Sequence, residues 1–98
     1  MELYTYIMDF RGGTYITQIN AESIEKSIFS WIEQIELELS EIKFIGHGTI
    51  NELKLMFSSG LIEQPSKLNN LLNVWYLVIY CKVGALYINI VKTIQQSK

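Results

Sequence analysis

The sequence has little of the cysteine that forms disulfides and of the proline-rich or Ser/Gly-rich stretches that form linkers. Its single cysteine, Cys81, cannot form an internal disulfide, and its apolar setting is typical of a small buried thiol. One proline and the lack of a Ser/Gly tract argue against a linker. We therefore expect one domain, residues 1–98, in a class of protein that needs no disulfide.

Positive charge is also scarce. The only arginine is Arg11, the lysines form no run, and the net charge is -2. Binding to nucleic acid requires several basic side chains gathered on one face, and binding to an anionic membrane surface has the same requirement. The sequence therefore predicts neither nucleic acid nor membrane as a partner.

Long apolar runs are missing as well. The most apolar segment, residues 71–91, is interrupted by Asn73, Lys82, Gly84 and Asn89, so it lacks the roughly 20 apolar residues of a membrane span. The first four residues have neither the basic nor the apolar region of a secretory signal. We expect a protein of the reducing cytoplasm.

The sequence does contain the material for a core. Its 98 residues are 49% hydrophobic and 18% charged, a composition typical of globular proteins. A chain of this length buries roughly two-thirds of the surface that it exposes when unfolded. Metal or disulfide support is therefore not needed for folding, and we expect no cofactor.

The first twenty residues predict a β-hairpin. Two β-rich runs, 3–10 and 15–19, flank Gly12-Gly13, and a glycine pair supplies the positive φ angles of a tight turn. With both glycines in the loop, Phe10 pairs with Tyr15. One face of the hairpin then collects the larger apolar side chains: Tyr4, Tyr6, Met8, Phe10, Tyr15 and Ile19.

Helices are predicted after this hairpin. Apolar residues recur at helical spacing, at Ile24, Ile28, Trp31, Ile32, Ile35 and Leu39, and Asn20 or Ser23 can cap the start. Residues 46–48, Gly-His-Gly, interrupt any helix. Residues 49–52 then have the form of a capping box, which predicts a short second helix that ends at Ser59-Gly60. Residues 61–72 are interpreted as a connection.

A second hairpin is predicted from residues 74–81 and 86–91, with Val83 and Gly84 in its loop. Tyr80 and Tyr87 would then be direct cross-strand neighbours. The order ββ-α-α-ββ predicts an α+β fold: a four-stranded antiparallel sheet from two hairpins, with the helices packed on one face. The order of the strands stays open.

Three tyrosines, Tyr76, Tyr80 and Tyr87, share the face opposite Trp75 and Leu77. Tyrosine suits surfaces that become buried on binding, because an apolar ring carries a polar hydroxyl. This face is therefore a candidate binding surface. The alternative is that the middle of the chain folds over it.

Charged residues supply weaker candidates. Asp9 and Arg11, two apart on a strand, point to one face and form either an exposed ion pair or a partner contact. Glu33 and Glu36 lie with Glu38 and Glu41 in a cluster that either meets a basic partner or is simply a solvated helix face.

His47 is the only histidine, and its two glycine neighbours leave the backbone free to present it. It is a candidate general base or metal ligand. No residues at ligand spacing accompany it, so we predict no metal site and interpret it as an ordinary loop histidine.

Both ends of the chain resemble a family of small uncharacterised bacterial proteins. At the first end the resemblance lies in Tyr4-Thr5-Tyr6, in Arg11-Gly12-Gly13-Thr14-Tyr15 and in a following helix with Trp31. At the second hairpin it lies in Asn73-Val74-Trp75 and Ile90-Val91-Lys92-Thr93. The resemblance covers both ends of the chain. It implies a bacterial or bacterium-associated origin and no known activity, so it assigns no functional residues.

The sequence thus predicts a non-catalytic binding protein that presents a preformed surface. A toxin-neutralising immunity protein would fit a small, acidic domain. One alternative is a homodimer formed through the tyrosine face. The other is an enzyme that uses His47.

Overall fold

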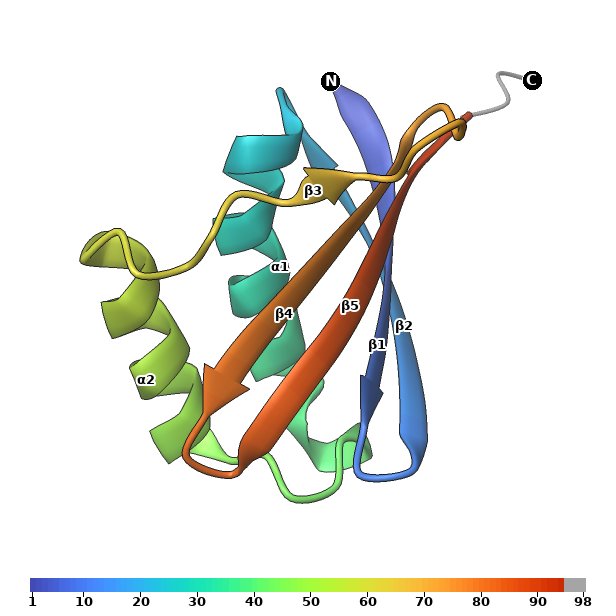
Figure 1. Cartoon of the computed structure of the whole chain (residues 1–98). Coiled ribbons are helices and arrows are strands. Elements are labelled where there is room, and N and C mark those ends of the chain that lie inside the picture. Colours follow the sequence, from blue (N-terminus) through green and yellow to red (C-terminus); the bar gives the residue numbers. More distant parts are fainter. Residues whose placement is uncertain (95–98) are drawn as a thin grey trace.

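A computed structural model describes residues 1–94 of the chain (Figure 1). The elements, in order, are β1 (Glu2–Phe10), β2 (Gly13–Ala21), α1 (Ile24–Leu37), a 3-10 turn η1 (Leu39–Glu41), α2 (His47–Ser58), β3 (Ser66–Lys67), β4 (Val74–Cys81) and β5 (Gly84–Thr93). The expected α+β class, with an antiparallel sheet built from hairpins, is confirmed.

The sheet has five strands in the order β2-β1-β5-β4-β3, so the prediction of four strands is wrong. The extra strand, β3, is only two residues long and pairs with Trp75 and Tyr76 of β4. Two residues carry no alternating pattern, which is why the segment looked like a connection. The two hairpins join through β1 and β5, which run antiparallel in the middle of the sheet.

The first hairpin has the predicted faces but a different loop. Phe10 pairs with Gly13, so the loop residues are Arg11 (φ 46°) and Gly12 (φ 82°), and not the glycine pair. A shift of two residues keeps every side chain on its predicted face, because the side-chain period of a strand is two. Two positive φ angles are the requirement of the loop that best matches strand twist.

Gly13 has a different task from the one predicted for it. A Cβ on Gly13 would lie 2.5 Å from the hydroxyl oxygen of Tyr15, closer than atoms can approach. The ring of Tyr15 therefore lies over the glycine, and its hydroxyl accepts a hydrogen bond from the Lys43 amide at 3.3 Å. Gly12 is therefore required for its positive φ angle, and Gly13 for the space that the Tyr15 side chain occupies.

The second hairpin shows the same shift. Cys81 pairs with Gly84, so Lys82 and Val83 form the loop, and not Val83 and Gly84. The carboxylate of Glu52 on α2 accepts the Lys82 amide at 3.1 and 3.3 Å. A contact from a distant helix thus holds the loop, and the local sequence could not indicate it.

Helix α1 carries the centre of the core. Ser23 caps it by accepting a hydrogen bond from the Lys26 amide, which decides between the two predicted caps. Trp31 is 1% exposed and its ring stacks on Tyr6 of β1, with centroids 5.2 Å apart. The predicted apolar stripe is therefore the packing face of the helix.

Helix α2 begins at His47, so the prediction that residues 46–48 break any helix is wrong, as is the capping box at Thr49. Gly46 is the extended N-cap, and its carbonyl accepts hydrogen bonds from the amides of Thr49 and Ile50. The side chain of Thr49 is buried in the first turn and caps nothing. The helix ends where predicted, with Ser59 as C-cap and Gly60 at φ 71°.

Both helices lie on the same side of the sheet (Figure 1). Helix α1 packs on β1 and β2, and α2 packs on α1 and β4. The core fills the space between the two layers, and its largest fully buried side chains are Trp31, Tyr6, Met8, Ile32, Ile35, Ile50, Leu53, Ile79, Leu86, Ile88 and Ile90. Within residues 1–94, no helix or strand covers the opposite side of the sheet.

Candidate functional site

The uncovered side of the sheet is the strongest candidate site. Tyr80 is 73% exposed, Ile16 64% and Tyr87 48%, so the middle of the chain does not fold over this side, and that alternative is wrong. We call this surface the open sheet face. It comprises Ile7 and Asp9 of β1, Ile16 of β2, Tyr76, Val78 and Tyr80 of β4, and Tyr87 and Val91 of β5.

The tyrosines are neighbours, but not in the predicted manner. Tyr87 pairs with Val78, and Tyr80 pairs with Ala85, so Tyr80 and Tyr87 are diagonal and not directly opposed. The reason is that the loop lies one residue earlier than predicted, which shifts each cross-strand pair by two residues. Diagonal side chains remain within reach of large rings, so the two tyrosines still form one patch.

Strand order brings the first hairpin into this patch. Asp9 is the cross-strand partner of Tyr87, and it accepts a hydrogen bond from the Thr14 hydroxyl at 2.6 Å. Ile7 pairs with Ile16 on one side and with Asn89 of β5 on the other. Ile7 and Ile16 were not candidates, because their role depends on β1 lying beside β5, which no local pattern indicates.

Arg11 lies away from Asp9. Its guanidinium carbon is 4.9 Å from the centre of the Phe44 ring and 5.6 Å from that of Phe10. Its position in the loop, and not on the strand, removes the side-chain alternation that predicted a shared face with Asp9. Arg11 therefore ties the first hairpin to the segment before α2.

The glutamates of α1 belong to the helical layer, on the other side of the sheet. Glu36 binds the ammonium group of Lys54 on α2 at 2.8 Å, and this hydrogen bond lowers the pKa of its carboxyl group. Glu38 accepts hydrogen bonds from Thr17 and Gln34. Glu33 is exposed, and the residues that line a hollow with it do not belong to the open sheet face.

His47 lies in the first turn of α2 with its side chain 79% exposed. The nearest carboxylate oxygen, on Glu36, is 3.9 Å from Nδ1, beyond hydrogen-bond length, and Glu36 is bound to Lys54. The geometry does not place His47 in a cleft with a partner group.

Within residues 1–94, no three His, Cys, Asp or Glu side chains gather closely enough to hold a metal ion. Over the same residues, neither helix has the length and apolar character needed to cross a membrane.

Comparisons of the chain with models of protein families, with curated proteins and with solved structures found no match. The resemblance to small bacterial proteins remains an expectation.

Proposed function

We propose that the protein is a small cytoplasmic binding protein, without catalytic activity, that meets a protein partner through the open sheet face. The observation that carries the proposal is the exposure of Tyr80 and Tyr87, with Ile16 on the far side of β1, on a sheet that has helices on one side only. Exposed apolar side chains gathered on one face often mark interaction sites in folded proteins.

The composition of the face supports a protein partner over a small molecule. Its side chains stand on paired strands of one rigid sheet, which keeps the entropy loss on binding small. Burying each large apolar side chain contributes about 1.5–3 kcal/mol. Tyrosine hydroxyls and Asp9 supply the polar contacts that give such a surface its specificity.

Within this class, we favour an immunity-type protein that neutralises a toxin by covering it. The chain is small and carries a net charge of -2, which would suit a basic partner. Since Glu36 and Glu38 are engaged within the fold, Asp9 is the carboxylate that the open sheet face itself offers. Steric cover by the sheet is therefore the favoured mechanism, ahead of attraction by the glutamates.

The first experiment compares variants in a binding assay. Partners are captured from the native host with the wild-type protein, then with Tyr80→Glu and Tyr87→Glu. Leu55→Glu is the matched control, because Leu55 is 67% exposed on α2, in the helical layer. We expect a specific partner that both tyrosine variants lose and Leu55→Glu keeps. A partner that all three variants retain would contradict the use of this face.

The toxin hypothesis has its own test. The protein is produced together with the product of the adjacent gene in a bacterial host. Growth restored by the wild type and not by Tyr80→Glu would support neutralisation, whereas a harmless neighbour would count against it.

The same face can instead meet a second copy of the chain. Light scattering over a wide range of protein concentrations separates this outcome from the proposal. A dimer that Tyr80→Glu dissociates would assign the open sheet face to self-association, and a wild-type monomer would leave it free for another protein.

A further inference from the structure

The outer edge of β4, which borders the open sheet face and shares Tyr76, Val78 and Tyr80 with it, carries an inference beyond that face. Strand β3 pairs only with Trp75 and Tyr76, whereas β4 continues to Cys81. From Leu77 onward, no strand of the described chain lies beside β4 on the side away from β5.

The direction of the main-chain groups on this edge follows from one hydrogen bond. The Leu68 amide donates to the Val74 carbonyl, so the backbone of Val74 points away from β5. In an antiparallel ladder, alternate residues point their N–H and C=O groups to the same side. Val78 and Tyr80 therefore point theirs outward, and within residues 1–94 no backbone group pairs with them.

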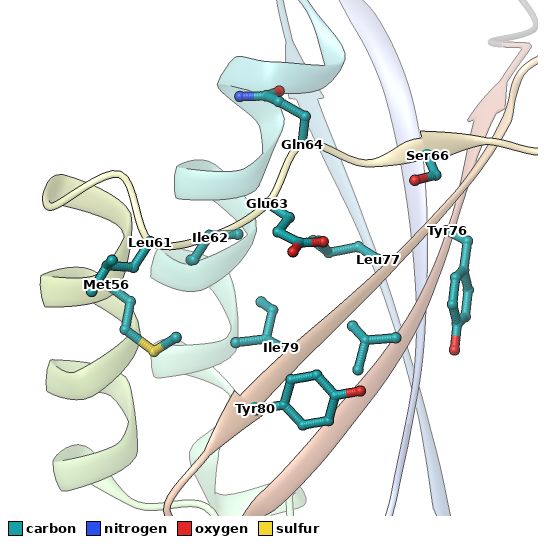
Figure 2. Close-up of a pocket in the computed structure, with 11 residues that line it drawn as sticks. Met56, Leu61, Ile62, Glu63, Gln64, Ser66, Tyr76, Leu77, Ile79 and Tyr80 are labelled. Carbon is teal, nitrogen blue, oxygen red and sulfur yellow. The ribbon is translucent and has the colours of Figure 1, made fainter.

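These groups face a groove of about 580 Å³ between β4 and the segment that connects α2 to β3 (Figure 2). Met56 of α2 and Ile62 of the segment, both half-buried, supply apolar wall. The side chain of Glu63 extends from the segment toward β4. The lining includes no lysine or arginine, so the groove has one acidic group without a basic neighbour in its wall.

We propose that this groove binds an extended polypeptide segment of a partner protein, which adds a strand to the edge of β4 beyond β3. The outward donors and acceptors of Val78 and Tyr80 repeat at strand spacing, and another extended backbone offers the complementary pattern. An apolar side chain of the segment contacts Met56 and Ile62. A lysine or arginine of the segment pairs with Glu63.

The size of the groove fits a short segment. A strand that runs beside residues 77–81 needs about five residues, or roughly 17 Å at about 3.3 Å per residue. A second copy of the chain fits less well, because its own segment 61–64 lies along the same edge and would enter the same space. A single extended peptide meets no such obstacle.

The experiment uses the full chain and a phage-displayed library of random peptides as the probe. We expect enriched peptides that combine a basic residue with alternating apolar residues. Val78→Pro removes one outward N–H and leaves the β4–β5 ladder intact, because proline is tolerated where the N–H faces away from the sheet. Val78→Pro and Glu63→Lys should each weaken binding by about threefold to tenfold.

Hydrogen exchange provides a readout that does not depend on the variants folding. In the free protein, the amides of Val78 and Tyr80 should exchange faster than those of Leu77 and Ile79, which face β5. Binding of an enriched peptide should slow the exchange of the Val78 and Tyr80 amides. Equal exchange of the two pairs in the free protein would overturn the assignment of an open edge.

The control separates this proposal from the open sheet face. Tyr87→Glu changes that face and no residue of the groove, so it should leave peptide binding unchanged. Three results would overturn the proposal: no enrichment, peptides that Tyr87→Glu abolishes, or a concentration-dependent dimer that Val78→Pro dissociates. The last would identify the occupant as a second copy.

Discussion

Two buried hydroxyl groups between the first strand and the first helix allow the stabilities of their variants to be ranked. Tyr6 and Ser27 are both 0% exposed, and their hydroxyl oxygens are 2.6 Å apart. The Ser27 hydroxyl donates to the Ile24 carbonyl, also at 2.6 Å. A serine hydroxyl has one hydrogen, so the Tyr6 hydroxyl is the donor to Ser27.

Because the Tyr6 hydroxyl is the donor, the two single variants should lose different amounts of stability. In Tyr6→Phe, Ser27 keeps its own donated bond, so the expected loss is about 0.5–1.5 kcal/mol, the net value of one hydrogen bond. In Ser27→Ala, the Tyr6 hydroxyl becomes a buried donor without an acceptor, which costs about 1–3 kcal/mol. The better helix propensity of alanine returns roughly 0.5 kcal/mol.

The double variant provides the control. Tyr6→Phe combined with Ser27→Ala removes both polar groups, so it should be more stable than Ser27→Ala alone. Urea unfolding followed by tryptophan fluorescence measures all three, because Trp31 stacks on Tyr6. If Tyr6→Phe is the more destabilising single variant, or the double variant equals the sum of the two, the assigned direction is wrong.

The pH dependence follows from the same burial. Burial raises the pKa of the Tyr6 hydroxyl above its usual value near 10. Below that value the hydroxyl is neutral in both the folded and the unfolded chain. Above it only the unfolded chain loses the proton, so the free energy of unfolding falls as the pH rises past about 10. Tyr6→Phe should make this alkaline loss shallower, and equal slopes would contradict the reasoning.

Two further predictions concern single positions. Burial raises the pKa of the Cys81 thiol to about 11, so at pH 8 Ellman's reagent should react much more slowly with the native protein than with the urea-unfolded chain; equal rates would contradict this. Gly13→Ala should cost about 1–3 kcal/mol in thermal unfolding because the Tyr15 ring must move, and adding Tyr15→Thr should return part of that loss; no recovery would show that the ring is not the obstacle.

Local patterns predicted the elements of the fold well where apolar periodicity was strong. The alternation in both hairpins and the stripe around Trp31 placed the correct side chains in the core. Both loops lie one residue earlier than predicted, which shifts the pairing of the strands by two residues. In the first loop, Arg11 adopts a positive φ angle, which the sequence predicted only for the two glycines. In this conformation its guanidinium group lies over the rings of Phe10 and Phe44.

The features that local patterns did not predict depend on contacts between residues far apart in the sequence. The pairing of β1 with β5 puts Asp9 beside Tyr87, and only that pairing makes the isoleucines of the first hairpin part of the tyrosine surface. Strand β3 and the Glu52 contact to the second loop likewise join residues far apart in the sequence. The candidate tyrosines were therefore predictable, whereas their neighbours were not.

The central place of β1 and β5 has a consequence for folding. Their pairs join Leu3 to Thr93 and Asp9 to Tyr87, nearly the full length of the described chain. During synthesis, the first hairpin and α1 emerge long before the strand that completes the middle of the sheet. Closing so large a loop costs chain entropy before the new contacts repay it, which slows folding. Until β5 arrives, the edge of β1 is an unpaired template that the nascent chain must keep from other strands.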